Sequence, residues 1–129
     1  MRKVLLALFM LTASVSVVSV QQVCAYAPAA AVTEPAFTAK VNLMDAQLGA
    51  GSITAAQSTW AEIHDMMLSV LATSKENIRT ASSPAAEAAL TSHIQNQITI
   101  YQAVWQMKTD LVTNRAAIRA KLGEFALTI

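Results

Sequence analysis

The sequence of 129 residues has few of the side chains from which metal and nucleophilic sites are usually built. It contains one cysteine, Cys24, and two histidines, His64 and His93. A single cysteine excludes paired-cysteine zinc sites and the two-cysteine attachment of haem. Neither histidine has a carboxylate or a second histidine three or four residues away, the spacing that helical metal sites need. We therefore expect no metal site, and we expect both histidines at the surface or flanking the core.

Charge is also scarce. Asp, Glu, Lys and Arg make up 13% of the chain, and the nine basic residues form no cluster. Because nucleic acid binding relies on grouped Lys and Arg, no nucleic acid partner is expected. The eight acidic residues are dispersed and no glycine-rich phosphate loop is present. Catalysis needs titratable groups that converge in a cleft, so we expect a protein that is not an enzyme and has no cofactor.

The first 25 residues have the pattern of a secretory signal peptide. Two basic residues begin it, no charge follows between residues 4 and 20, and small residues come next. A cut after Ala25 or Ala27 would remove Cys24 and leave seven basic against eight acidic residues, a net charge of −1. An uncleaved anchor is the alternative, because the apolar run approaches the ~20 residues of a spanning helix. We expect export to the periplasm or beyond, with membrane contact only through this segment if it stays uncut.

The remaining chain divides into an Ala/Pro tether, residues 26–36, and a helical domain, residues 37–129. After Pro35 the only proline is Pro84, and alanine, leucine, glutamine and methionine, which favour helices, are abundant. No stretch alternates in the manner of a strand. The domain is predicted to be all-α, with about 100 residues and no cysteine, so packing alone must stabilise it.

Two helices are predicted before residue 80. The first spans about residues 37–48 and ends at "GAGS", and the second spans about residues 53–79. Thr54 and Gln57 predict a capping box at the start of the second helix. Its apolar positions recur every three or four residues as in a coiled coil, at Ile53, Ala56, Trp60, Ile63, Met67, Val70, Ser74 and Ile78.

The third predicted helix spans about residues 84–125, with Ser83 as its cap and Pro84 at its first position. A tight turn at 80–83 makes the two long helices an antiparallel hairpin. The longer one overhangs by about 20 Å, a length that the short helix at about 37–48 would fit. That helix lies in series with its successor or folds back to complete a bundle, and the sequence leaves both arrangements open.

The hairpin places Trp60, Tyr101 and Trp105 in one aromatic layer, because Trp60 and Trp105 differ by about 3 Å in level. Ile63 and Met67 follow Trp60 on the same stripe. These five residues form a core layer or line an interaction surface. Met67 and His93 differ by about 4.5 Å in level, so a haem held by this pair is a further option.

Two short stretches are similar to a known family. "NLMDAQ" and "ITAAQ" resemble the LTxxQ motif of small periplasmic stress chaperones, with Met44 in place of threonine in the first copy. The plan of a signal, an Ala/Pro tether and Ala/Gln-rich helices is similar to that of minor pilin or accessory proteins of type IV secretion systems. The first resemblance implies a helical exported chaperone, and the second implies a part in envelope assembly.

The predicted function is binding to another protein. Low charge, the coiled-coil-like stripe and the mismatch in helix length all indicate an apolar surface that the chain does not cover itself. The partner would be another envelope protein, a second copy of this chain, or both, as in an envelope-assembly or type IV secretion or conjugation accessory. The alternative is a periplasmic chaperone or carrier of apolar segments, and the third candidate is a b-type haem-binding bundle.

Overall fold

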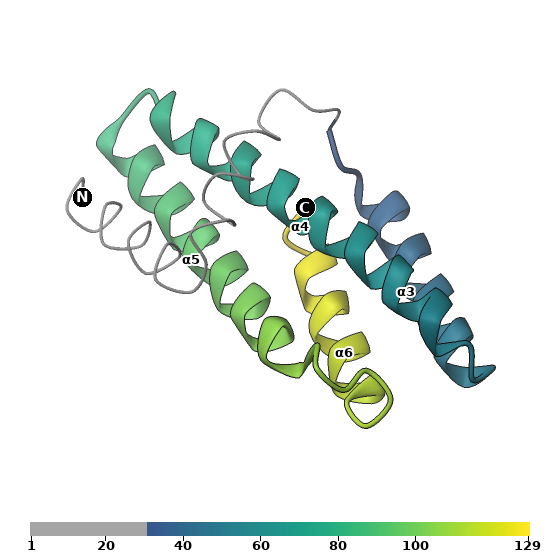
Figure 1. Cartoon of the computed structure of the whole chain (residues 1–129). Coiled ribbons are helices and arrows are strands. Elements are labelled where there is room, and N and C mark those ends of the chain that lie inside the picture. The colour runs from purple at the N-terminus through teal and green to yellow at the C-terminus, as the bar shows by residue number, and fades with distance from the viewer. Residues whose placement is uncertain (1–30) are drawn as a thin grey trace. The chain divides into compact units, whose positions relative to one another are not determined.

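The computed structural model describes residues 31–129, which contain four α-helices and no strand. The helices are α3 (Glu34–Gly49), α4 (Ile53–Arg79), α5 (Pro84–Met107) and α6 (Arg115–Ala126) (Figure 1). The prediction of an all-α fold is confirmed. The predicted signal peptide and the first residues of the tether lie outside the described part of the chain. None of the helices in residues 31–129 is long and apolar enough to cross a membrane.

The described chain forms two compact units. The hairpin unit contains residues 68–98, and the four-helix unit contains residues 32–67 and 99–129. In the hairpin unit the end of α4 and the start of α5 contact each other, and Ser74 Oγ donates a hydrogen bond of 2.6 Å to Gln97 Oε1. Both of these polar side chains are buried among apolar ones, which include Leu71, Ile78 and Ile94.

Helix α3 begins three residues before its predicted start. Thr33 Oγ1 accepts a hydrogen bond of 3.3 Å from the amide N of Ala36, and Pro35 lies in the first turn, where a missing N–H costs nothing. The helix ends at Gly49, and the chain leaves it through Gly51, whose φ of 76° suits glycine. The last three residues of the predicted tether, 34–36, therefore belong to α3.

Helix α4 has the predicted bounds of 53 and 79, but the predicted capping box is wrong. Thr54 lies within the first turn, and its carbonyl oxygen accepts a hydrogen bond from Ser58 Oγ. The first helical hydrogen bond runs from Ala56 N to the carbonyl oxygen of Ser52, at 3.0 Å. The helix therefore begins at Ile53, whereas a cap at Thr54 would require it to begin after Thr54. Helix α5 begins as predicted, with Ser83 Oγ accepting from the third residue of the helix at 3.1 Å.

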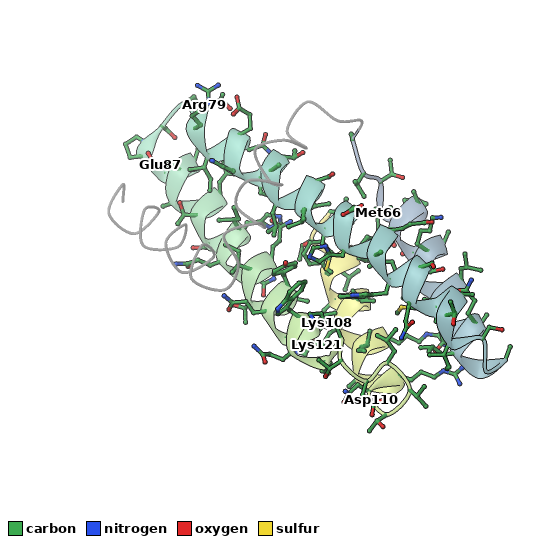
Figure 2. The ribbon with its side chains drawn as sticks, in the orientation of Figure 1. Met66, Arg79, Glu87, Lys108, Asp110 and Lys121 are labelled. Carbon is green, nitrogen blue, oxygen red and sulfur yellow. The ribbon has the colours of Figure 1, made fainter. Side chains whose placement is uncertain are left out.

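The single helix predicted over 84–125 is wrong, because α5 ends at Met107 and α6 begins at Arg115. At the break, Asp110 Oδ1 accepts from Thr113 N at 2.9 Å. Asn114 Nδ2 donates to the carbonyl oxygens of Met107 and Asp110, at 3.2 and 3.0 Å. These side chains replace the helical partners of the backbone, so the chain turns without proline or glycine. Figure 2 shows Asp110 at this turn.

Within the four-helix unit, α3 folds back and lies next to α6 (Figure 1). The ring centroids of Phe37 and Phe125 are 5.4 Å apart, and Asp45 reaches the other end of α6, so the two helices are antiparallel. Of the two arrangements that the sequence left open, α3 adopts the folded-back one. The core of the unit is formed by buried side chains of all four helices and of the turn before α6: Phe37, Val41, Met44, Leu48, Ile63, Met67, Tyr101, Val104, Leu111, Ile118, Leu122 and Phe125.

An ion cluster fixes α6 on α3. Asp45 accepts from Arg115 Nε at 2.8 Å and from Arg119 Nη1 at 2.7 Å. The hydrogen bond from Arg115 is the main cause that lowers the pKa of Asp45 below its ordinary value. Gly49 makes room for this cluster, since a Cβ there would lie 3.0 Å from Arg115 Nη2. Glycine at the end of α3 is therefore explained by a contact within the chain.

Candidate functional site

Four aromatic rings meet between α4 and α5 in the four-helix unit, and we call them the aromatic cluster: Trp60, His64, Tyr101 and Trp105. The centroid of the His64 ring lies 5.0 Å from that of Trp105, 5.7 Å from that of Tyr101 and 6.1 Å from that of Trp60. Tyr101 and Trp105 stack with their centroids 6.0 Å apart. The structure thus brings the three aromatic residues that the sequence singled out around one histidine.

Helical spacing explains how the cluster forms. Trp60 and His64 are four residues apart on α4, and Tyr101 and Trp105 are four residues apart on α5, so each pair shares one helix face. Antiparallel pairing of α4 with α5 then places the two faces opposite each other. The cluster therefore lies on two rigid helices, which fixes its geometry better than loops would.

The inner part of the cluster is a hydrogen-bonded pair. Tyr101 is only 1% exposed, and its hydroxyl lies 2.9 Å from His64 Nε2. The side chain of His64 is 14% exposed. Trp60 and Trp105 are half-buried, so part of each indole reaches the surface. The cluster therefore has a closed polar centre and an aromatic rim that is accessible to a binding partner.

The electrostatics of the cluster favour the neutral form of His64. Burial is the main cause that lowers the pKa of His64 below its ordinary value, and the positive charge of Lys108 lowers it further. Asp65 acts in the opposite direction, with its Oδ1 3.9 Å from His64 Nδ1. Lys108 Nζ lies 4.3 Å from the ring centroid of Trp105, within cation–π distance, and is labelled in Figure 2. Lys108 therefore places a positive charge over an aromatic face of the cluster.

This arrangement suits binding. The imidazole Nε2 and the phenol hydroxyl are hydrogen-bonded to each other, and the rim offers indole faces and an ammonium group. No group of three or more metal-ligating side chains occurs in residues 31–129. What the cluster offers a ligand is aromatic stacking, apolar contact and one positively charged donor.

The other residues that the sequence proposed lie elsewhere. Ile63 and Met67 are fully buried and belong to the core of the four-helix unit. His93, the proposed haem partner of Met67, is exposed on α5 in the hairpin unit. Met67 is thus closed off by its own unit, while His93 faces solvent as expected for a surface histidine.

Two members of the site were missed from the sequence. His64 was expected at the surface or beside the core, but it is the centre of the cluster. The sequence feature that indicates this role is the position of His64, four residues after Trp60. Lys108 was not singled out from the sequence, but it lies three residues after Trp105 and covers that ring. Aromatic partners at helical spacing would have indicated both residues.

Comparisons with protein-family models, with curated proteins and with solved structures found no match to this chain. The two LTxxQ-like stretches lie in α3 and in the first turn of α4. Gln47, the last residue of "NLMDAQ", accepts a hydrogen bond of 2.7 Å from Thr59 Oγ1. That glutamine thus has a structural partner on α4.

Proposed function

We propose that the mature chain is a small exported binding protein, without enzymatic activity, that docks another envelope protein through the aromatic cluster. The supporting observation is the pair of half-buried tryptophans, Trp60 and Trp105, held on two helices around the buried His64–Tyr101 pair. Tryptophan and tyrosine are enriched at the energetic centres of protein interfaces. Export follows from the signal pattern of residues 1–25 and places the partner in the envelope.

The rim of the cluster favours a protein partner with an apolar side chain beside an acceptor group. Indole faces supply contact area at a low cost in side-chain entropy, because Trp60 and Trp105 are already held by their neighbours. The ammonium group of Lys108, placed over Trp105, can donate to a carbonyl or carboxylate of the partner. A role as an assembly or secretion accessory is consistent with this kind of surface.

Crosslinking in the native envelope tests the proposal. The tagged full-length protein is compared with Trp60→Leu and Trp105→Leu, which remove the indoles but keep apolar bulk in the fold. Gln106→Leu is the matched control, because Gln106 is exposed and adjacent to Trp105 on the same helix. Mass spectrometry then identifies the captured proteins.

We expect one dominant partner with the wild type and the control, and a loss of about tenfold or more with each tryptophan variant. Retention of that partner by both tryptophan variants would refute the role of the cluster. Capture of many unrelated exported proteins in place of one would favour the chaperone or carrier function instead.

A further inference from the structure

The lysine at the edge of the aromatic cluster has no acid of its own chain as a partner. The ammonium group of Lys108 contacts the face of Trp105, 4.3 Å from the ring centroid. All eight acidic residues of the sequence lie between residues 34 and 124, within the described part, and none of them pairs with Lys108. Most other cations of residues 31–129 do hold carboxylates: Lys40 pairs with Glu62, Arg79 with Glu76, Arg115 and Arg119 with Asp45, and Lys121 with Glu124.

The acid closest to Lys108 in the sequence is directed elsewhere. Both carboxylate oxygens of Asp110 accept hydrogen bonds from Thr113, at 2.9 Å from its amide N and at 2.7 Å from its hydroxyl. These bonds stabilise the turn after α5, and they are the main causes that lower the pKa of Asp110 below its ordinary value. The chain thus has a carboxylate two residues from Lys108 and uses it to shape the backbone. A carboxylate that pairs with Lys108 has to come from another molecule.

The two tryptophans of the rim add hydrogen-bond donors that also have no acceptor. Neither the indole N–H of Trp60 nor that of Trp105 donates to a partner in residues 31–129, and both rings are half-buried. Every enclosed side-chain nitrogen or oxygen in this part of the chain has a hydrogen-bond partner, so these two unpaired N–H groups reach solvent. An indole nitrogen donates and does not accept. The rim therefore suits a ligand group that is negatively charged and rich in acceptors.

The acid of the cluster lies on the other helix. Asp65 of α4 has its Oδ1 3.9 Å from His64 Nδ1, and its side chain is 49% exposed. Asp65 repels an approaching anion, whereas Lys108, just after the end of α5, attracts one. A negatively charged ligand is therefore directed towards the α5 side of the cluster.

We propose that the partner docks on the aromatic cluster with an internal acidic segment, in which a side-chain carboxylate binds Lys108 and an adjacent apolar side chain packs on the indoles. This inference rests on the proposed function and names the chemistry that the cluster selects. A carboxylate binds an ammonium group more strongly than a neutral carbonyl does, because both groups are charged. An internal segment fits because the cluster lies along the sides of two helices, α4 and α5, so a peptide can continue past it in both directions.

Zero-length crosslinking with a carbodiimide tests the proposal, because this reagent joins a lysine amine to a carboxylate in contact with it. The tagged full-length protein is treated in its native envelope fraction, and mass spectrometry identifies the joined peptides. Lys108→Gln removes the attracting charge, and Asp65→Asn removes the repelling one. Lys121→Gln is the matched control, because Lys121 pairs with Glu124 on α6, outside the cluster. Circular dichroism and thermal unfolding verify that each variant folds.

We expect an amide bond between Lys108 and an internal Asp or Glu of one envelope protein. The purified partner should bind Lys108→Gln about tenfold more weakly than the wild type, because a hydrogen bond to a charged group is lost. Lys121→Gln should bind with the wild-type Kd. Asp65→Asn should bind about twofold more tightly, because a like charge near the bound carboxylate is removed.

The outcomes separate this inference from the proposed function. A partner that both tryptophan variants lose, but that binds Lys108→Gln with the wild-type Kd, would overturn the acidic segment and leave the proposed function intact. Retention of the partner by both tryptophan variants would remove the proposed function and this inference together. A crosslink from Lys108 to a chain-terminal carboxylate, or to a second copy of this chain, would also overturn the proposal. Weaker binding of Asp65→Asn would contradict the selection by charge.

Discussion

The hydrogen bond between His64 and Tyr101 joins α4 to α5 at the centre of the aromatic cluster. A neutral imidazole and a phenol share it, in a place that is largely closed to solvent. Removal of one partner from such a pair leaves the other buried without its hydrogen bond, and this costs more than the bond itself contributes. Loss of the Tyr101 hydroxyl or of the His64 imidazole alone should therefore destabilise the cluster.

Tyr101→Phe removes the hydroxyl and should lower the free energy of unfolding by about 1–3 kcal/mol, because His64 Nε2 loses its buried partner. Urea unfolding of the mature protein measures the change. His64→Phe and the double variant complete a double-mutant cycle. If the two substitutions are additive, the contact does not contribute and the prediction is wrong.

Stability should fall with acid through His64. Its folded pKa lies below the ordinary 6.5, so below 6.5 the unfolded chain binds more protons than the folded one. The free energy of unfolding should therefore decline as the pH drops through 6.5 towards the folded pKa. His64 should add little slope above about pH 7.5, where the unfolded imidazole is also largely neutral. Asp45, whose pKa is lowered from 3.8, loses its contribution only in stronger acid.

Urea unfolding at about pH 7.5 and about pH 5.5 measures this dependence. His64→Gln should remove most of the difference between the two conditions. The exposed His93→Gln serves as the control and should keep the wild-type difference. A wild-type difference that survives His64→Gln would assign the pH dependence to another group.

The tryptophans and tyrosine of the cluster could be grouped from the sequence because the turn and the helical rise set their levels. The role of His64 could not be found in this way. Its partner, the Tyr101 hydroxyl, lies 37 positions away along the chain, and no local pattern identifies that contact. Burial of an imidazole depends on what the opposite helix presents, which is a tertiary property.

At the scale of the helices, boundaries were predicted well where the backbone itself demands an end. The glycines before α4 permit backbone φ values that end a helix, and Pro84 lacks the N–H that the first turn of α5 does not need. Both signals belong to the residue type, so they can be recognised in the sequence. The break between α5 and α6 was not readable. Leu111 within the break and Ile118 after it are both buried, so the apolar spacing continues through the turn that Asp110 and Asn114 stabilise.

The two helical glycines should respond oppositely to alanine. Gly123→Ala adds a Cβ in open space and should raise the free energy of unfolding by about 0.5–1 kcal/mol. Gly49→Ala places its Cβ 3.0 Å from Arg115 Nη2, so the guanidinium has to shift against Asp45. We expect no gain from this second change, because the weaker contact between Arg115 and Asp45 offsets the better helix propensity.

Thermal unfolding compares the two variants. A higher melting temperature for Gly49→Ala than for Gly123→Ala would contradict the geometry at both sites.

At the scale of the whole molecule, the sequence left the position of α3 open because its length fits the overhang in either arrangement. The break after α5 decides the matter. It releases α6 as a separate helix, and Phe37 then meets Phe125 while Asp45 meets the arginines of α6. A continuous helix over 84–125 would have carried these partners past the end of α3. The turn between α5 and α6 was not predicted, and for the same reason the sequence could not decide between the two arrangements of α3.

The buried Ser74–Gln97 pair has a consequence for the register of the hairpin. Helices with a repeating apolar stripe can slide past each other by a heptad and still match apolar residues with apolar residues. A slip of seven residues would move Gln97 from the level of Ser74 to the level of Met67 or Ala81. Neither side chain has a hydroxyl group that could donate a hydrogen bond to the amide oxygen of Gln97. Only the native register keeps this hydrogen bond, so one polar pair distinguishes it from alignments that hydrophobicity alone would treat as equal.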